Sequence, residues 1–390
     1  MTFRVLTIFG TRPEAIKLAP VVKLLEKDPR FISRICVTSQ HYELLEQALE
    51  AFEIEPDHDL GVMAPNQGLH ELTSAVLLRT KTVVEEENAN IVVVQGDTTT
   101  AFTASLSAFY CKVPIAHVEA GLRTGDLSAP YPEEANRLLV SRLADIHFCP
   151  TETNRTNLLR EDVSERAIVV TGNTGIDALL MVREKVRDRD PREWAEQFGP
   201  ALGAIQDRGK RLILVTGHRR EHFGPGFRSI CKGIRYVAER FPEVAIVYPV
   251  HLNPNVRQPV LEILSSVGNI HLVEPVAYSP FVYLMNRAHF ILSDSGGIQE
   301  EAPSLGKPVL VMRALTERPE AVAAGSALLV GADVERIAAE SARLLEDPNA
   351  YDRMARVANP FGDGHASERI VDALYRFLKG PPRAGPRVVG

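Results

Sequence analysis

The sequence predicts an α/β fold made of two doubly wound parallel-sheet domains, and three observations support this prediction. Short apolar runs alternate with helical patterns from one end of the chain to the other. Most of these runs are continuous in Val, Ile and Leu, as in strands that helices cover on both faces. With 390 residues and twelve such runs, the chain exceeds what one open twisted sheet usually carries. Strict alternation of strand and helix also implies right-handed crossovers.

The expected strands form two series along the chain. The first series is expected at residues 3–9, 32–38, 91–95, 115–118, 146–149 and 168–171. The second series is expected at residues 212–216, 244–249, 270–273, 290–293, 308–312 and 327–330. Helical periodicity predicts helices at 43–52 and 69–87, a helix over 334–345 capped by Asp333, and a last helix over 366–378.

The boundary between the two domains is expected at residues 172–173. It precedes a charged stretch, 183–210, that contains Asp-Pro, Gly-Pro and the only Trp. The first domain is therefore expected to span 1–172 and the second 173–365. Residues 381–390 are rich in Gly and Pro and are expected to form a flexible tail.

Composition and charge exclude several classes of protein. The formal charge is −6 and no basic stripe stands out, so nucleic acid is not an expected partner. No apolar run approaches the roughly 18 residues of a membrane span. The four cysteines include no Cys-x-x-Cys pair, which argues against a zinc site or a disulfide framework. Cys36 and Cys149 lie in apolar strands and are expected to be buried and inert. We expect a reduced, cytoplasmic protein.

Ligands of open α/β sheets bind at the carboxyl ends of the strands, so the polar residues there are candidates for a site. In the first half, Arg12 and Lys17 flank a helix start, where they either hold an anionic group or are solvated surface cations. Asp97 follows the third strand and is expected to cap a helix. Glu119 ends an apolar strand and must be either paired or functional. Glu134 is expected only to complement a helix dipole.

In the second half, His218 follows the first strand of the series among cations, which favours a ligand role over a structural one. The strongest local signal is Ser295-Gly296-Gly297, because two glycines let backbone N–H groups approach a phosphate. Glu301 lies one turn further, in a position suited to sugar hydroxyls. His251, Arg313 and Arg318 add polar groups at neighbouring strand ends.

Eight segments of the chain, taken together, carry a family resemblance. In order, they are FGTRPEAIKLAP, QGDTTTAF, HVEAGLRTGD, PYPEEANR, GHRRE, YPVHLNP, SDSGGIQEEAPSLGKPVL and TERPEA. With these segments the chain resembles the bacterial, non-hydrolysing UDP-N-acetylglucosamine 2-epimerases from about Val5 to about Leu378. Two departures are small: Ser39 stands where Gly or Ala usually precedes the Gln-His pair, and Val276 occupies a variable position.

The resemblance implies two Rossmann-like domains facing a central cleft, in the glycosyltransferase-like two-domain architecture. It implies a homodimer, a C-terminal helix (366–380) that packs back on the first domain, and no metal or nicotinamide cofactor. The implied reaction is the reversible interconversion of UDP-N-acetylglucosamine and UDP-N-acetylmannosamine, which supplies cell-envelope polysaccharide.

The resemblance also implies roles for individual residues. The residues that match the family's catalytic positions are Asp97, Glu119, Glu133 and His218. Those that match its nucleotide-sugar positions are Arg12, Lys17, Val276, Phe281, Ser295, Gly296, Gly297, Glu301 and Arg318. A second substrate molecule activates members of the family, and the residues corresponding to its site are Gln40, His41, Gln67, Arg219 and His251.

The C2 carbon of the sugar is not adjacent to a carbonyl carbon, so its proton cannot be removed by forming an enolate. Elimination of UDP to a glycal, followed by re-addition, needs a carboxylate base, an acid and cations that stabilise the departing diphosphate. Which acid is the base stays open. The alternatives are a hydrolysing epimerase that releases UDP and N-acetylmannosamine, a glycosyltransferase of the same architecture, and a sensor without turnover. A dehydrogenase is excluded, because no Gly-x-Gly-x-x-Gly follows a strand.

Overall fold

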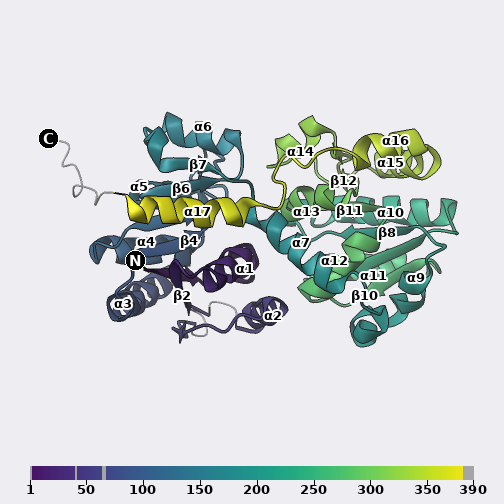
Figure 1. Cartoon of the computed structure of the whole chain (residues 1–390). Coiled ribbons are helices and arrows are strands. Elements are labelled where there is room, and N and C mark those ends of the chain that lie inside the picture. The colour runs from purple at the N-terminus through teal and green to yellow at the C-terminus, as the bar shows by residue number, and fades with distance from the viewer. Residues whose placement is uncertain (1, 40–41, 64–66, 381–390) are drawn as a thin grey trace. The chain divides into compact units, whose positions relative to one another are not determined.

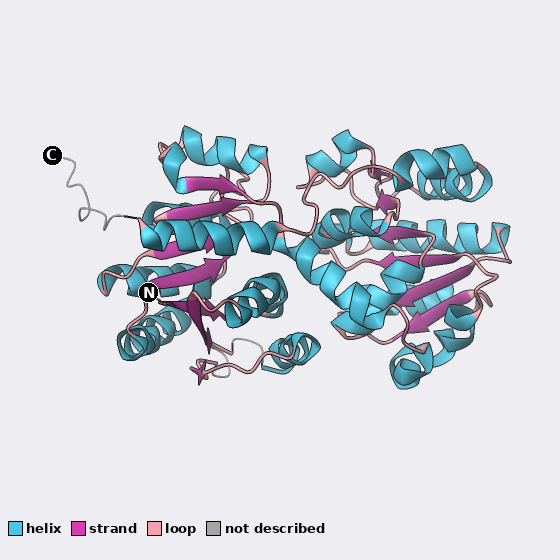
Figure 2. Ribbon diagram, viewed as in Figure 1, coloured by secondary structure: helices cyan, strands magenta, loops and turns pink. Residues whose placement is uncertain are grey.

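The computed structural model describes residues 2–39, 42–63 and 67–380, with residues 42–44 described by their backbone alone. The chain divides into two compact units, and each contains one parallel sheet with helices on both faces (Figures 1 and 2). Unit 1 comprises Met1–Ala178 and Gly364–Gly390, and unit 2 comprises Leu179–Asp363. The prediction of two parallel-sheet α/β domains is confirmed.

The sheet of unit 1 has seven parallel strands in the order β3-β2-β1-β4-β5-β6-β7. These strands are β1 (Phe3–Phe9), β2 (Phe31–Val37), β3 (His58–Asp59), β4 (Ile91–Gln95), β5 (Ile115–Val118), β6 (Ile146–Cys149) and β7 (Ile168–Val170). The helices are α1 (Arg12–Lys27), α2 (Tyr42–Phe52), α3 (Leu69–Glu87), α4 (Thr99–Tyr110), α5 (Glu133–Leu143), α6 (Glu152–Arg160) and α17 (Ala366–Lys379), with a 3₁₀ turn at Glu165–Ala167. The helix α7 (Thr174–Val186) runs across the division between the units.

The sheet of unit 2 has six parallel strands in the order β10-β9-β8-β11-β12-β13. They are β8 (Leu212–Thr216), β9 (Ala245–Pro249), β10 (Ile270–Val273), β11 (Phe290–Ser293), β12 (Val309–Val311) and β13 (Ala327–Leu329). The helices are α8 (Ala195–Phe198), α9 (Leu202–Gln206), α10 (Pro225–Arg240), α11 (Pro254–Leu264), α12 (Tyr278–Arg287), α13 (Gly296–Glu301), α14 (Pro319–Ala324), α15 (Val334–Glu346) and α16 (Pro348–Ala355). Short 3₁₀ turns lie at Pro191–Trp194, Gly199–Ala201, Arg220–His222 and Ala302–Leu305.

All twelve expected strands are present, with ends that agree within a residue at each side. The central strand β4 is buried at every position, as its unbroken apolar sequence predicts. The thirteenth strand, β3, was not expected, because His58 and Asp59 form no apolar run. Asp333 caps α15 as predicted, since its Oδ1 accepts from Arg336 N at 2.9 Å.

The last helix, α17, packs on α1 within unit 1 (Figure 1). Tyr375 lies edge-on to Phe3 and Phe31, with ring centroids 6.2 and 6.1 Å apart. Asp177 receives the first two N–H groups of the helix, from Ala366 at 3.3 Å and Ser367 at 2.7 Å. Apolar rings on one side and a buried cap at the start hold α17 in place.

The predicted boundary at 172–173 lies just before α7, whereas the compact units divide after Ala178, inside that helix. The expected tail, 381–390, lies outside the described residues. Among the residues described, no helix combines the length and the apolar character that a membrane crossing requires.

Candidate active site

In unit 1, the buried Glu14 joins the turn after β1 to the turn after β4. Its Oε2 accepts from Gly10 N at 3.0 Å and from Thr11 N and Oγ1, both at 2.8 Å. Its Oε1 accepts from Thr98 Oγ1 at 2.7 Å. Burial raises the pKa of Glu14, and the hydrogen bonds from Thr98 and Thr11 oppose that rise. One carboxyl group therefore fixes two turns, of which the first leads into Arg12 at the start of α1 and the second contains Asp97.

Gly10 permits a close approach in the same region. A Cβ atom at this position would lie 2.1 Å from Thr38 Oγ1 and 2.6 Å from Thr100 Oγ1, inside the contact distance of either atom. The two hydroxyls are themselves 2.9 Å apart. The glycine is therefore needed for packing between the turn after β1 and the start of α4.

Glu119 is paired, which was one of its two predicted states. Lys17 Nζ lies 2.6 Å from each of its carboxylate oxygens, and the side-chain amide of Gln95 also donates to it. The Glu119 backbone has a φ of +62°, a left-handed conformation that is uncommon for a residue with a side chain. Its side chain is 12% exposed, so the ion pair is partly shielded from water. The end of β5 thus presents a charged and oriented carboxylate.

Asp97 does not cap a helix, so the predicted capping role is wrong. Thr98 caps α4 instead, since its Oγ1 accepts from Ala101 N at 3.0 Å. The Asp97 carboxylate turns to Arg137, whose Nε and Nη2 both lie 2.8 Å from Oδ2. Asn136 Nδ2 holds the Asp97 carbonyl at 2.9 Å. The guanidinium offers a stronger, charge-assisted partner than a backbone N–H, and the neighbouring threonine serves as the cap.

Glu134 does more than complement a helix dipole, which was its predicted role. Its Oε2 lies 2.8 Å from Arg137 Nη1, and its Oε1 accepts from Thr124 N at 2.9 Å and Gly125 N at 3.0 Å. Burial alone would raise the pKa of Glu134, but the hydrogen bonds from Gly125 and Arg137 outweigh burial and lower it. Asp97, Arg137 and Glu134 therefore form one chain of charges. The half-buried Glu133 begins α5, one turn before Arg137.

His117 stabilises the turn that contains Asp97. Its Nε2 lies 2.7 Å from the carbonyl oxygen of Gly96, which adopts a φ of +70° between Gln95 and Asp97. Burial lowers the pKa of His117 to about 4, so the ring is neutral at neutral pH and Nε2–H is the donor. The sequence did not assign this role to His117, nor their roles to Gln95 and Arg137. In the sequence, Gln95 and His117 were marked only by their position at the end of a strand. Arg137 was marked only by its position one helical turn after an acid.

In unit 2, the loop after β8 is anchored by the buried Asp294. Its Oδ2 accepts from His218 N at 2.7 Å and Arg219 N at 2.8 Å. The Tyr248 hydroxyl donates to Gly217 O at 3.2 Å from the other side. The His218 ring stacks on that of His251 with centroids 5.4 Å apart and an interplanar angle of 16°. Burial lowers the pKa of His218, Asp294 opposes this, and His251 and Arg219 add to the lowering.

The Ser295-Gly296-Gly297 segment lies next to β11 in a cationic setting. An added Cβ at Gly296 would lie 3.7 Å from Arg318 Cζ and 3.9 Å from Arg219 Nη2, so both guanidinium groups approach this backbone. Arg318 Nε donates to the buried Glu300, which orients the guanidinium. Bare backbone and two cations in one place suit an anion with several oxygens. His218, Arg219 and Asp294 lie in the same unit.

The remaining predicted residues lie in both units. Phe281 lies on α12 and Glu301 ends α13, and both are half-buried, as is Val276 before α12. Gln67 lies just before α3. Gln40 and His41 lie outside the described residues.

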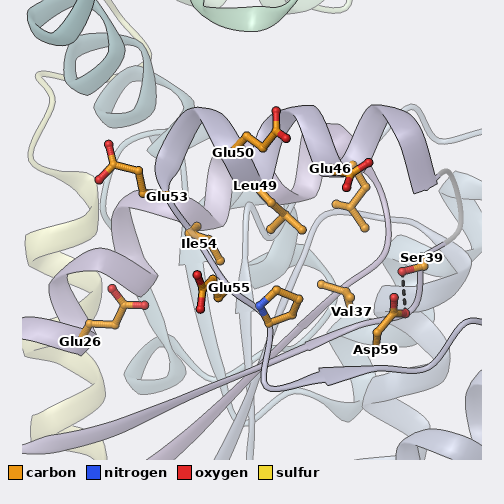
Figure 3. A pocket seen from close by; sticks show the side chains of 12 residues that line it. Glu26, Val37, Ser39, Glu46, Leu49, Glu50, Glu53, Ile54, Glu55 and Asp59 are labelled. Carbon is orange, nitrogen blue, oxygen red and sulfur yellow. Dashed lines mark hydrogen bonds between the residues drawn. The ribbon is translucent and has the colours of Figure 1, made fainter.

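A separate cavity in unit 1, of about 670 Å³, lies between α2 and the sheet (Figure 3). Apolar residues such as Leu49 and Ile54 share its lining with carboxylates. The acidic residues that line it are Glu26, Glu46, Glu50, Glu53, Glu55 and Asp59. Because its charge would repel a diphosphate, we exclude this cavity as the site of a nucleotide sugar.

Cys36 and Cys149 are buried, as predicted, and Cys231 is buried as well. Burial raises the pKa of each of these three thiols to about 12, which keeps it protonated and unreactive. Within the part of the chain that the structure describes, no three His, Cys, Asp or Glu side chains are grouped so that they could hold a metal ion.

Comparison with known proteins gives a consistent result. The family model described as UDP-N-acetylglucosamine 2-epimerase matches residues 23–375. A protein of that name from Escherichia coli is 57% identical over 373 residues, 95% of this chain and 98% of the relative. The crystal structure of the Neisseria meningitidis epimerase bound to UDP-GlcNAc is 51% identical with a TM-score of 0.87, and covers 96% of this chain and 100% of that one.

Two further structures are more distant. The Methanocaldococcus jannaschii epimerase, solved in complex with UDP-GlcNAc and UDP, is 34% identical with a TM-score of 0.78, and covers 96% of this chain and 100% of that one. The kitacinnamycin glycotransferase is 11% identical with a TM-score of 0.63 over 97% of this chain and 100% of that one, a likeness of fold alone.

Proposed function

The chain belongs to the UDP-N-acetylglucosamine 2-epimerase family, and on this premise we propose that it interconverts UDP-N-acetylglucosamine and UDP-N-acetylmannosamine without releasing free sugar. The observation that carries the proposal is the set of oriented carboxylates in unit 1, Asp97 on Arg137 and Glu119 on Lys17. A glycosyltransferase or a sensor has no need for such acids beside an anionic substrate.

The proposed reaction is an elimination followed by an addition. A carboxylate takes the C2 proton while the C1–oxygen bond breaks, and the bonding pair leaves with UDP. The C–H electron pair forms the C1=C2 double bond of a 2-acetamidoglucal. A proton is then delivered to C2 on the opposite face, and a UDP oxygen adds to C1. No proton or electron is gained or lost overall, so the reaction needs no redox partner.

Asp97, Glu119 and Glu133 are the proposed donors and acceptors of the C2 proton. The Arg137 pair fixes the Asp97 carboxylate in one orientation, which an acid–base group requires. Two acids are needed because the proton leaves one face of the sugar and returns to the other. Trapping experiments with single variants of these three residues would show which one is the base and which is the acid.

The Lys17–Glu119 pair suggests how substrate binding prepares the acid. Lys17 is a compact cation that binds phosphate as a point charge. Lys17 Nζ lies 2.6 Å from both oxygens of Glu119. A substrate phosphate that attracts Lys17 would weaken this ion pair and so favour proton transfer to or from Glu119. Arrival of the anion and activation of the acid would then be coupled.

The proposed diphosphate-binding residues of unit 2 are His218, Ser295, Gly296, Gly297 and Arg318. Bare glycine backbone and the oriented Arg318 guanidinium support this assignment, because both stabilise charge that grows on the leaving UDP. Arg12 and Lys17 are proposed to bind the same substrate from unit 1. Val276, Phe281 and Glu301 are proposed to contact the uridine and its ribose.

We also propose activation by a second UDP-N-acetylglucosamine, bound by Gln40, His41, Gln67, Arg219 and His251. Two contacts support a link to the reaction: His251 stacks on His218, and Arg219 N shares the Asp294 carboxylate with His218 N. A ligand that holds His251 or Arg219 would therefore constrain His218. A homodimer, a cytoplasmic location and functional domains of 1–172 with 366–380, and of 173–365, complete the proposal.

The decisive experiment is turnover of UDP-N-acetylglucosamine in deuterated water, followed by NMR and mass spectrometry. Deuterium at C2 in both epimers, with UDP still attached, is the expected result. Accumulation of free N-acetylmannosamine and UDP would instead identify the hydrolysing reaction. Unchanged substrate in the presence of a folded protein would indicate a sensor that binds the nucleotide sugar without turnover.

Activation is tested in the reverse direction. With UDP-N-acetylmannosamine alone, turnover should begin slowly, and a small addition of UDP-N-acetylglucosamine should raise the initial rate. A His251→Ala variant should lose this response, so that its initial rates with and without the addition are equal. Equal initial rates with and without the addition in the native chain would contradict the allosteric proposal.

A further inference from the structure

We propose that Asp294 is a positioning residue for His218: it fixes the tautomer and orientation of the imidazole and raises its affinity for a proton when a diphosphate binds. The inference deepens the proposed function and rests on it, because it gives His218 a partner that sets its state. Asp294 lies in the short segment between β11 and α13. All groups concerned belong to unit 2.

The two oxygens of Asp294 have unequal surroundings. The residue is 0% exposed. Oδ2 accepts two backbone N–H groups, from His218 at 2.7 Å and Arg219 at 2.8 Å. Oδ1 is buried and has no hydrogen-bond partner among the described residues. A buried carboxylate oxygen without a donor is costly, and such groups in folded proteins usually have a specific role.

The imidazole ring of His218 lies close to Oδ1. His218 Nδ1 lies 3.6 Å from Asp294 Oδ1, inside ion-pair range but beyond a hydrogen bond. A charge-assisted N–H···O bond measures about 2.8 Å, so a small rotation of the ring would complete it. The His218 side chain is 43% exposed and therefore has room to rotate. A loop that is anchored through its backbone and carries a movable ring is suited to this motion.

The charges around His218 oppose one another. Burial, His251 and Arg219 all lower the pKa of His218, whereas Asp294 raises it. A phosphate next to the ring would add a second negative group and favour the imidazolium. With Nδ1–H directed at Asp294, Nε2 is the nitrogen available to the ligand. His218 would then be positively charged while the C1–oxygen bond to UDP breaks. It would lose this charge once UDP has left the site.

A purely structural role for Asp294 makes a different prediction. If the carboxylate served only to hold the loop, an amide oxygen could accept the same two N–H groups. Asp294→Asn therefore keeps the loop anchor and removes the charge. Its amide N–H₂ can face Nδ1 only as a donor, which forces the opposite tautomer of His218. Tyr248→Phe is the matched control, because it removes the hydroxyl anchor on Gly217 and leaves the charge in place.

The experiment uses the full chain and follows His218 by ¹⁵N and ¹H NMR, with the signal assigned by its loss in His218→Gln. In the native chain, Nδ1 should carry the proton of the neutral ring, and inorganic pyrophosphate should raise the His218 pKa. In Asp294→Asn, that rise should shrink by about one pH unit. The kcat should fall about 10- to 100-fold with a much smaller change in KM. In Tyr248→Phe, the titration should keep its native response, even where the melting temperature falls.

Three results would overturn the inference. The first is that the neutral ring of His218 in the native chain carries its proton on Nε2. This measurement needs no variant, so it applies even if Asp294→Asn does not fold. The second is an unchanged titration in a folded Asp294→Asn. The third is an equal titration change in Tyr248→Phe. Failure of the proposed function would show differently, as an absence of epimerisation in the native chain, while the NMR measurements would still report on Asp294.

Discussion

The candidate residues of unit 1 and unit 2 differ in the charged group that they present. In unit 1, the carboxylates of Asp97 and Glu119 are each held by a cation of the same unit, Arg137 and Lys17. In unit 2, Arg318 is likewise held by Glu300, but its guanidinium and that of Arg219 also approach the bare backbone of Gly296. Acids that move protons must keep one orientation, so partners within the protein help them. A seat for a diphosphate instead needs donors directed at the place where the ligand's charge will lie.

The largest effect is expected from Asp97→Asn. The amide cannot take a proton and binds Arg137 less well, so kcat should fall by about 10²- to 10⁴-fold, while UDP binding measured by calorimetry stays nearly native. Full activity in this variant would remove Asp97 from the reaction. The control is Asp188→Asn, at a side chain that is 88% exposed, which should change neither quantity.

The next largest effect concerns stability at low pH and compares buried histidines in the two units. Burial lowers the pKa of both His117 in unit 1 and His289 in unit 2 to about 4, against about 6.5 unfolded. The unfolded chain therefore binds more protons below pH 6.5, and stability is lost as pH falls from 6.5 to 4. For the fully buried His117, the loss is about 3 kcal/mol.

The effect of His289 should be smaller, because solvent partly reaches its ring. Urea unfolding of His117→Gln and His289→Gln between pH 7 and pH 4.5, followed by circular dichroism, measures both. The free energy of unfolding of the His117→Gln variant should fall less on acidification than that of the native chain. Identical pH slopes in the native chain and His117→Gln would contradict this account.

A moderate effect is expected from Gly296→Ala in unit 2. The added methyl group meets only ordinary van der Waals distances of 3.7 to 3.9 Å, so the melting temperature should stay close to native. The methyl group occupies the place that a phosphate would take, and KM should rise about 10-fold, which corresponds to about 1.4 kcal/mol. Gly203→Ala, where an added Cβ meets nothing within 4 Å, should leave KM unchanged and serves as the control.

The smallest effect tests how firmly α17 is part of unit 1. Asp177→Ala removes the carboxylate that receives Ala366 N and Ser367 N and should lower stability by about 1 kcal/mol. Asp372→Asn, at a side chain that is 62% exposed and pairs with Arg30, should change it by less than about 0.5 kcal/mol. Equal effects of the two substitutions would show that the cap contributes nothing beyond a surface charge.

The strands were predictable because buried parallel strands such as β4 are continuous in apolar residues. The short β3 was not, since His58 and Asp59 owe their strand conformation to pairing with β2. The positions of Arg12, Asp97, His218 and Ser295 at strand ends also followed from the sequence. Their partners did not.

Partners depend on which distant segments meet. Asp97 lies 40 residues before Arg137, and Lys17 lies 102 residues before Glu119. No local rule predicts such pairs, and a local rule misled the assignment of Asp97. Asp before a threonine-rich helix start ordinarily caps it, but Arg137 competes successfully for the carboxylate, and Thr98 is adjacent and able to replace it.

Unit 2 is a continuous segment, Leu179–Asp363, inserted into unit 1, whose last helix comes from the end of the chain. On the ribosome, the rings of Phe3 and Phe31 therefore cannot pack against Tyr375 until synthesis has passed through all of unit 2. The inserted segment is complete before the unit that surrounds it in sequence. A chain truncated between Ala178 and α17 would lack the Tyr375 ring that packs against Phe3 and Phe31, and we expect such a product to be degraded faster than the full chain.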